Sequence, residues 1–352
     1  MTSTNETSPK KMTYVRLGQS GLKVSRIILG LMGYGDPKWE GGWVQGEEEA
    51  IKIIKAAYDA GIQTFDTANM YSNGESERVL GKAIKQLKLP RDEIVVMTKV
   101  YGAVSRNPSE NLFGVEVDQL GYVNQHGLSR KHIFEAVKHS LERLQLDYVD
   151  VLQCHRFDDN TPIAETMQAL HDVVQAGYVR YIGMSSCFTY QFHAMQNYAI
   201  ANKLTPFVSM QNHYNLLYRE EEREMVPTLK LFRTGMIPWS PLSRGILSRP
   251  LNDETTNRAK TDAWVNILPK TREANAAIVN RVEEIAKARN VSMAQVAVAW
   301  TLSKDYLTAP IVGTTSLKNL KDIIGAIDVK LTEDEIKQLE EPYVPQPVVG
   351  HW

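Results

Sequence analysis

The amino-acid sequence predicts a single-domain (β/α)8 barrel. Eight short apolar runs of strand type alternate along the chain with longer stretches of helical periodicity, which is the pattern of parallel βα units. An open dinucleotide-binding sheet would carry Gly-x-Gly-x-x-Gly after its first strand. The corresponding segment, Gly30-Leu-Met-Gly33-Tyr-Gly35, has a different spacing and leads into a long loop. The count of eight and the missing fingerprint favour the closed barrel over a doubly wound sheet.

The expected elements follow one another regularly along the chain. The expected strands are Arg26–Leu31, Thr64–Thr67, Ile94–Val100, Tyr148–Gln153, Tyr181–Ser185, Phe207–Gln211, Gly235–Trp239 and Ala309–Val312. The amphipathic stretches between them are expected to be helices, among them Glu47–Ala60, Ser76–Leu87, Arg130–Leu144, Ile163–Ala176 and Phe188–Ala201. In the first of these, apolar residues at positions 50, 51, 54, 57 and 58 recur at helical spacing, and Gly61 follows as a C-cap.

Composition and charge are typical of a globular enzyme. Of the 352 residues 43% are hydrophobic, and the net charge of −1 gives no basic field for nucleic acid. No apolar run reaches the roughly 18 residues that span a bilayer, and the N-terminus lacks the apolar segment of a signal peptide. Only two cysteines are present, so no disulfide framework is expected. We expect a flexible tail at 1–12, a barrel with its C-terminal tail at 13–352, and a cytoplasmic protein.

Two long connections interrupt the alternation of strands and helices. Residues 102–127 are rich in Asn, Gly and polar residues, and residues 249–269 mix Pro, Asn, Thr and charge. Loops of this length in a compact domain are usually lids or binding loops. Both follow strands, so we expect them at the C-terminal end of the barrel, where barrel active sites are built. The Pro-rich residues 342–352 are expected to cover or rim the same end.

Four polar residues mark the ends of predicted strands. Asp66 and Tyr71 follow the second strand, Lys99 lies near the end of the third, and His155 follows the fourth. A lysine or histidine that closes a buried strand is costly unless it is paired or functional. A helix cap would explain Asp66 alone and a loop aromatic would explain Tyr71 alone, but the set as a whole favours a catalytic site. A metal site is not expected, because no second histidine stands at ligand spacing.

At these residues the chain resembles the aldo-keto reductases, in the branch of the aryl-alcohol dehydrogenase-like and potassium-channel β-subunit-like proteins. The motifs that carry the resemblance are Phe65-Asp-Thr-Ala-x-x-Tyr71, Thr98-Lys99, Asp147-Tyr-Val-Asp-x-x-x-x-His155 and Trp239-Ser-Pro-Leu-Ser-Arg-Gly245. The similarity extends from Leu17 to Pro342. It implies a (β/α)8 barrel that reduces a small-molecule carbonyl with NADPH.

The four strand-end residues have complementary roles in such a reaction. Hydride delivered to a carbonyl carbon leaves negative charge on the oxygen, which needs a donor in place. The resemblance implies that Tyr71 is this acid. A neighbouring ammonium stabilises phenolate, so Lys99 would make the phenol more acidic, and Asp66 would hold Lys99 charged and aimed. His155 would donate to or orient the carbonyl oxygen.

The resemblance also implies how the nicotinamide end of the cofactor is held. Ser185, Ser186 and Gln211 match the positions that bind the nicotinamide amide. Relatives more often have Asn at position 186, and a serine offers one donor instead of two. The pyrophosphate is expected along Trp239, Ser240, Pro241, Leu242, Ser243, Arg244 and Gly245. A simple turn after a strand would explain the Ser-Pro-Leu sequence equally well.

The eighth predicted strand leads into a helix start with hydroxyls and nearby cations, which is a ready phosphate site. By resemblance, Gly313, Thr315 and Asn319 surround the 2′-phosphate end of NADP, and Asp322 lies near the adenine. The candidate cations are Lys318, Arg249 and Arg258. We therefore expect NADPH rather than NADH. A capped helix without a ligand would explain the hydroxyls but not the basic residues, and relatives usually have Asn at Ile323.

Aromatic residues near the expected site are candidates for the substrate walls. Tyr34 is expected to face the substrate, with Trp39, Trp43, Tyr101 and Trp264 as walls. Gly33, in a position where relatives often have Thr, is expected to widen the floor beside the cofactor. Such walls favour aromatic or other apolar aldehydes, although most tryptophans in proteins are packing residues.

A second class of function stays open on the sequence alone. The channel β-subunit-like relatives suggest a subunit whose bound NADP(H) reports redox state to a partner. No extended arm or conspicuous partner-binding segment supports that alternative. The physiological carbonyl, the favoured direction and the oligomeric state are left open.

Overall fold

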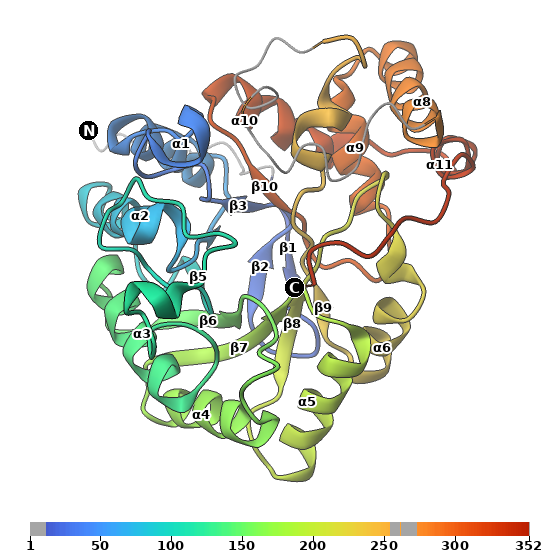
Figure 1. Ribbon diagram of the computed structural model, residues 1–352. Helices are drawn as coiled ribbons and strands as arrows, with labels where there is room; N and C mark the ends of the chain where they lie inside the picture. The colour runs from blue at the N-terminus through green and yellow to red at the C-terminus, as the bar shows by residue number, and fades with distance from the viewer. Residues whose placement is uncertain (1–11, 254–260, 262–272, 352) are drawn as a thin grey trace, which may run out of the picture.

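The computed structural model describes residues 12–253, 261 and 273–351, and its eight parallel strands form a (β/α)8 barrel (Figure 1). The strands are β3 (Ile28–Gly30), β4 (Thr64–Asp66), β5 (Val95–Val100), β6 (Val149–Cys154), β7 (Val179–Ser185), β8 (Phe207–Gln211), β9 (Gly235–Met236) and β10 (Ile311–Gly313). They pair in the order β10-β3-β4-β5-β6-β7-β8-β9. Parallel bridges from Trp239 to Ile311 and from Met236 to Leu307 close the seam between β9 and β10. The predicted fold class is confirmed.

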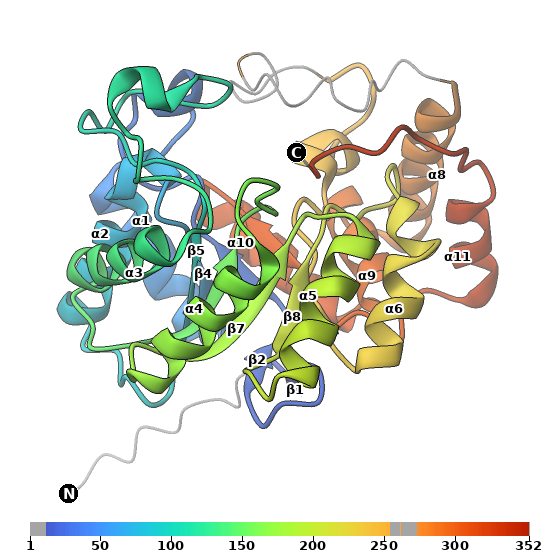
Figure 2. The same ribbon diagram turned by 60° about the horizontal axis from the view of Figure 1, so that its bottom comes forward.

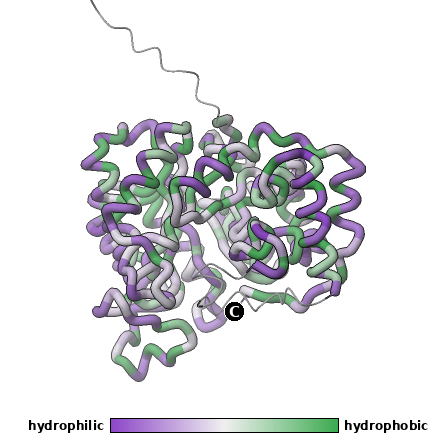
Figure 3. Tube along the Cα trace, turned by 90° about the horizontal axis from the view of Figure 1, so that it is seen from above, coloured by the Kyte–Doolittle hydropathy of each residue, from purple (hydrophilic) through white to green (hydrophobic). Residues whose placement is uncertain are grey.

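Helices surround the strands (Figure 1). They are α1 (Glu47–Asp59), α2 (Glu75–Gln86), α3 (Arg130–Leu144), α4 (Ile163–Gln175), α5 (Thr189–Ala201), α6 (Met225–Phe232), α8 (Glu273–Arg289), α9 (Met293–Leu302), α10 (Leu317–Ile324) and α11 (Glu333–Glu340). Hydrophobic and hydrophilic segments alternate along the helical turns (Figure 3), as expected where a helix turns one face to the core and the other to solvent. The five helices named from the sequence are found within one residue of their predicted bounds. None of the described helices is long and apolar enough to cross a membrane.

The last two strands are shorter than the sequence predicts. β9 was expected to reach Trp239 but ends at Met236, and β10 begins at Ile311 instead of Ala309. Pro238 supplies no amide hydrogen for pairing. Its carbonyl still accepts from the amide of Ile311 at 2.8 Å, so the seam is held by single bonds and isolated bridges.

A β-hairpin that the sequence did not predict covers the N-terminal end of the barrel (Figure 2). It consists of the antiparallel strands β1 (Tyr14–Arg16) and β2 (Lys23–Ser25). Leu17 and Val24 are fully buried. Gly18 has a φ of 58°, and a Cβ there would lie 2.7 Å from the carbonyl oxygen of Arg233. A strand of three residues shows too little periodicity to be detected from the sequence, so the hairpin was identified only from the structure.

Two clusters of buried hydrophobic residues stabilise the barrel strands. The larger one lies between the strands and the helices and includes Met12, Leu29, Phe65, Val96 and Leu152. The smaller one joins the hairpin to strand residues, among them Ile28, Val95, Met97, Val151 and Ile237. Burying each such side chain contributes about 2 kcal/mol. The apolar filling next to the hairpin leaves the polar strand-end residues to gather at the opposite, C-terminal end.

Candidate active site

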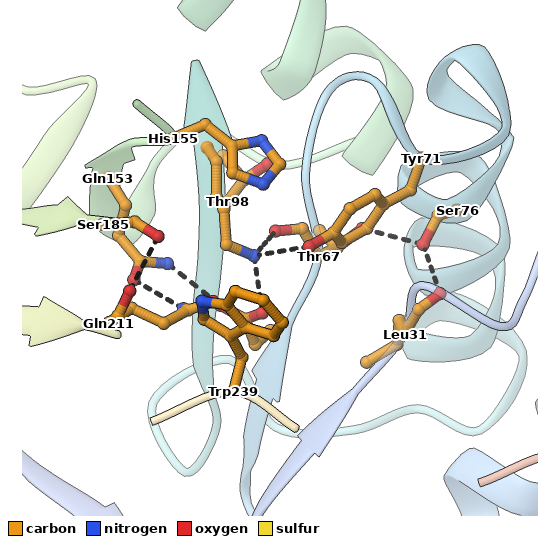
Figure 4. Close-up of polar contacts among 12 residues, drawn as sticks. Leu31, Thr67, Tyr71, Ser76, Thr98, Gln153, His155, Ser185, Gln211 and Trp239 are labelled. Atoms are coloured by element: carbon orange, nitrogen blue, oxygen red, sulfur yellow. Dashed lines mark hydrogen bonds and ion pairs between the residues drawn. The ribbon is translucent and has the colours of Figure 1, made fainter. Parts of the chain in front are cut away.

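The four candidate catalytic residues meet at the C-terminal end of the barrel, and Figure 4 shows two of them, Tyr71 and His155. Asp66 ends β4 and Lys99 lies one residue before the end of β5. His155 directly follows β6, and Tyr71 opens the short 3-10 turn η2 (Tyr71–Gly74) that precedes α2. Neighbouring parallel strands end at the same edge, which is why residues far apart in the sequence come together here.

Lys99 is at the centre of this group, with a side chain only 1% exposed. Its Nζ donates to Asp66 Oδ2 at 2.6 Å, to the Thr67 carbonyl at 2.8 Å and to Tyr71 Oη at 3.2 Å. These three bonds use all the hydrogens of the ammonium. Burial opposes charge on Lys99, but Asp66 and Tyr71 outweigh it and raise the pKa of Lys99. The group beside the phenol is therefore a fixed positive charge.

His155 lies edge-on to Tyr71, with ring centroids 5.7 Å apart and an interplanar angle of 83°. Burial, together with the charges of Arg156 and Lys99, lowers the pKa of His155 well below its usual range. The imidazole is therefore neutral. Its Nδ1 is buried and forms no hydrogen bond within the described chain. A buried polar atom without a partner is costly, which suits a ring that binds a ligand.

Gln153 belongs to the same site, although sequence reasoning missed it. It lies on β6 in register with Lys99, and its Nε2 donates to Asp66 Oδ1 at 2.9 Å. Gln211 on β8 donates to the same oxygen at 3.0 Å and to Gln153 Oε1 at 2.8 Å. We call Asp66, Lys99, Gln153 and Gln211 the polar floor. A lone amide within the apolar run of β6 was the signal in the sequence.

The turn that carries Tyr71 is held by the long loop after β5. Ser72 and Asn73 have left-handed backbones, with φ of 46° and 50°. The Asn73 side-chain amide donates to the carbonyls of Asn107, Pro108 and Glu110 at 3.1, 3.3 and 2.6 Å. Its Oδ1 accepts from the Ser105 amide at 2.9 Å. One side chain thus joins the turn to the loop.

The candidate nicotinamide residues adjoin the polar floor. Ser185 Oγ donates to the carbonyl of Gln211 at 2.8 Å. Ser186, with a φ of 38°, accepts from Trp239 Nε1 at 2.9 Å. Trp239 also stacks on His213 at 4.3 Å between centroids and 11° between planes. The indole is therefore held both at its edge and on one face.

The candidate pyrophosphate segment has an unusual backbone. It runs from Trp239 through Ser240, Pro241 and Leu242 into the 3-10 segment η5 (Ser243–Ser248). Ser240, Ser243 and Arg244 have φ of 54°, 46° and 53°. A Cβ on Gly245 would lie 2.5 Å from Nη2 of Arg249, so Arg249 packs on this glycine. Such strained backbones cluster at ligand sites. Arg258 lies outside the described residues.

The candidate 2′-phosphate site lies where β10 leads into α10. Ser316 caps α10 by accepting from the Asn319 amide at 3.4 Å, and the side chains of Lys318 and Asn319 are exposed. The exposed Gly313 ends β10 beside them, followed by Thr315.

Two neighbours of this helix start have packing roles. Asp322 accepts from Ser292 Oγ at 2.6 Å, which ties α10 to the N-cap of α9. Ile323, where relatives usually have Asn, is buried in the core. No adenine contact from position 323 is therefore available.

The candidate substrate walls differ in how deeply they are buried. Trp39 and Trp43 are buried in one cluster with Val44, against which Tyr71 packs. Tyr101 is half-buried and Trp264 lies outside the described residues. Tyr34 is fully buried and its hydroxyl donates to the Thr314 carbonyl at 2.8 Å, so its place beside the substrate stays a prediction.

Gly33 packs closely against two neighbours. A Cβ at this position would lie 3.1 Å from the Thr315 methyl and 3.3 Å from the ring of Trp43. The space that the missing side chain leaves is therefore filled by these two neighbours.

The C-terminal segment lies across the same end of the barrel, as expected (Figure 1). His351 contacts Glu221 at 2.9 Å, and its ring packs edge-on against Phe188. A Cβ on Gly350 would lie 3.2 Å from the ring of Trp239. The tail therefore reaches the candidate cofactor residues.

Comparisons with known proteins agree with this geometry. Residues 26–343 match the model of the aldo/keto reductase family. The chain is 49% identical over 344 residues to versiconal hemiacetal acetate reductase of Aspergillus parasiticus, covering 96% of this chain and 98% of the relative. A putative aryl-alcohol dehydrogenase of Schizosaccharomyces pombe is 50% identical over 347 residues, covering 96% and 97%. One from Saccharomyces cerevisiae is 45% identical over 336 residues, covering 94% and 97%.

Proposed function

The chain belongs to the aldo/keto reductase family, and from this premise we propose that it is an NADPH-dependent reductase of aldehydes and ketones with Tyr71 as general acid. As a member it is an oxidoreductase that acts on carbonyl and alcohol groups with a nicotinamide cofactor. The observation that carries the proposal is the contact of the Lys99 ammonium with both Asp66 and Tyr71.

The residues of the site divide the reaction between them. The nicotinamide cofactor, when bound, supplies the hydride. Tyr71 gives its proton to the carbonyl oxygen, and Lys99, 3.2 Å away, stabilises the negative charge that remains on the phenol oxygen. Asp66 keeps Lys99 charged and in place. His155, a neutral ring edge-on to Tyr71, would orient the carbonyl oxygen.

The preference for NADPH over NADH rests on the start of α10. The N-terminus of a helix attracts anions, and the exposed side chains of Lys318 and Asn319 add a cation and an amide there. Arg249, which packs on Gly245 in the segment after β9, would be a further cation for this phosphate. Ser185, Ser186 and Gln211 would hold the nicotinamide amide at the other end of the cofactor.

Aromatic or other apolar aldehydes are the substrate class that fits best. Trp39 and Trp43 pack in one apolar cluster against the proposed acid, and Tyr101 at the end of β5 is half-buried. One barrel domain over residues 13–352 and a cytoplasmic site of action complete the proposal. Both cysteines are unpaired and buried, in keeping with a reducing compartment.

Tyr71→Phe tests the mechanism directly. We expect kcat for nitrobenzaldehyde to fall by about 10²–10⁴-fold with NADPH affinity retained, because only the transferable proton is lost. NADPH oxidation is followed by absorbance across a panel of aldehydes, with NADH in parallel. Tyr190→Phe is the matched control, since Tyr190 is 69% exposed on α5.

Each outcome of this experiment has a distinct meaning. Undiminished turnover by Tyr71→Phe would show that Tyr71 is not the general acid. Equal rates with NADH and NADPH would contradict the proposed preference for NADPH. Tight NADPH binding by the wild type with negligible turnover across the panel would favour the redox-sensing subunit instead.

A further inference from the structure

We propose that Gln153 is a positioning residue that sets the orientation of Gln211 and thereby links the nicotinamide-amide site to Asp66. The inference rests on the proposed function, because it concerns the same cofactor. Gln153 is fully buried and Gln211 is 2% exposed, and both contact the carboxylate that holds Lys99 (Figure 4).

Asp66 determines the orientation of the side-chain amides of Gln153 and Gln211. An ionised carboxylate only accepts hydrogen bonds, so each glutamine must turn its Nε2 toward Asp66 Oδ1, at 2.9 and 3.0 Å. Gln211 then gives its second hydrogen to Gln153 Oε1 at 2.8 Å. Both hydrogens of the Gln211 amide are used inside the floor. Its Oε1 forms no hydrogen bond with the described residues, which leaves this oxygen for a ligand.

This orientation determines what Gln211 offers to the cofactor. An amide oxygen accepts but does not donate, so Gln211 pairs with the NH2 of the nicotinamide carboxamide rather than with its carbonyl. Without Gln153, one of the two bonds that hold the Gln211 amide disappears. The amide can then rotate and present Nε2 instead. Gln153 therefore determines that Gln211 presents its acceptor oxygen, rather than its amide hydrogens, to the cofactor.

Asp66 makes this arrangement a link between two parts of the reaction. Its Oδ1 accepts from the two glutamines, and its Oδ2 accepts from Lys99 at 2.6 Å. Hydrogen bonds in such a buried network polarise one another. A carboxamide bound at Gln211 thus acts on the same carboxylate that orients the cation beside Tyr71.

The test compares the binding of NADP⁺ and its 3-acetylpyridine analogue, whose acetyl group has no NH2. Wild type should bind the analogue about tenfold more weakly, because Oε1 of Gln211 is left unpaired. In Gln153→Met, which keeps the side-chain length, the two ligands should differ by less than about threefold. Dissociation constants are measured by quenching of tryptophan fluorescence and by calorimetry.

Matched variants separate this role from general loss of structure. Gln196→Leu removes another buried glutamine, whose amide bonds the backbone of Phe207 away from the site. It should keep the tenfold difference. Gln153→Leu provides a second substitution if Gln153→Met folds poorly, and circular dichroism reports folding of each variant.

The result that would overturn the inference is a folded Gln153 variant with the wild-type ratio of the two constants. A wild type that binds both ligands equally would overturn it as well, while leaving the proposed reductase intact. Failure of wild type to bind NADP⁺ at all would instead count against the proposed cofactor. The ratio is informative because a purely structural role for Gln153 would weaken both ligands alike.

Discussion

The polar floor and the rim of the barrel are built in opposite ways. In the floor, side chains from strand ends bond one another and are almost inaccessible to solvent, as in the contacts of Lys99 with Asp66. In the rim, made of the turn 71–74, the loop 105–110 and residues 240–249, side chains bond backbone and several residues adopt left-handed conformations. The difference means that the floor is held by side-chain charges and amides that bond one another, whereas the rim is held by bonds between side chains and backbone. Under the proposed mechanism, the floor would supply the charge for the chemistry and the rim would hold the acid and the ligands.

Lys99→Met should give the largest effect, because it removes the central charge of the floor. We expect kcat/KM to fall by about 10³-fold or more, since nothing then stabilises the Tyr71 oxygen and Asp66 is left as a buried, unbalanced charge. Breaking a buried ion pair on one side also costs about 3–5 kcal/mol of stability. Steady-state kinetics and urea unfolding measure the two effects.

The double variant Asp66→Asn/Lys99→Met separates these effects. It should regain much of the stability, because no lone charge stays buried, yet it should remain inactive. Recovery of activity in the double variant would contradict the assignment of Lys99 to the chemistry.

Asn73→Ala tests the rim and should have a smaller effect. Removing one side chain breaks four bonds between the Tyr71 turn and the loop. We expect kcat/KM to fall by about tenfold, with faster protease cleavage within residues 105–110. Asn197→Ala, at an exposed asparagine on α5, is the control. A variant with normal cleavage and normal kinetics would show that the turn does not depend on the loop.

The smallest effect is expected from acidification of the site around His155. Burial and the charges of Arg156 and Lys99 lower the pKa of His155. We therefore expect kcat/KM to show no decrease from protonation of this histidine as the pH falls through about 6.5, the usual pKa of a histidine. Stability should behave differently: His155 is neutral when folded but takes up a proton when unfolded, so the free energy of unfolding decreases below pH 6.5. Steady-state kinetics and Tm measured between pH 5 and 8 check the two expectations. A decrease in kcat/KM near pH 6.5 that is present in the wild type and absent in His155→Gln would contradict the expectation for activity.

Much of the fold was predictable because its periodicity is strong. Helices such as α3 follow from regular apolar spacing and from caps such as Ser129, which accepts from the His132 amide. The candidate site was only half predictable. Lys99 and His155 are unusual at strand ends, whereas the role of Gln153 depends on a distance across the barrel that no local pattern encodes. The bond of the Tyr34 hydroxyl to the Thr314 carbonyl could not be predicted for the same reason, since the two residues are 280 positions apart.

The hairpin also has a consequence for the synthesis of the protein. Residues 14–26 leave the ribosome early, but the guanidinium of Arg26 donates to carbonyls 276 and 281 residues further along the chain. At translation rates of about 5–20 residues per second, this segment waits roughly 15 to 60 seconds for its partners. During that time the guanidinium of Arg26 has none of these carbonyl acceptors and is hydrated or bonded to other parts of the nascent chain. A polypeptide released before residue 302 would lack the acceptors that complete this end of the barrel.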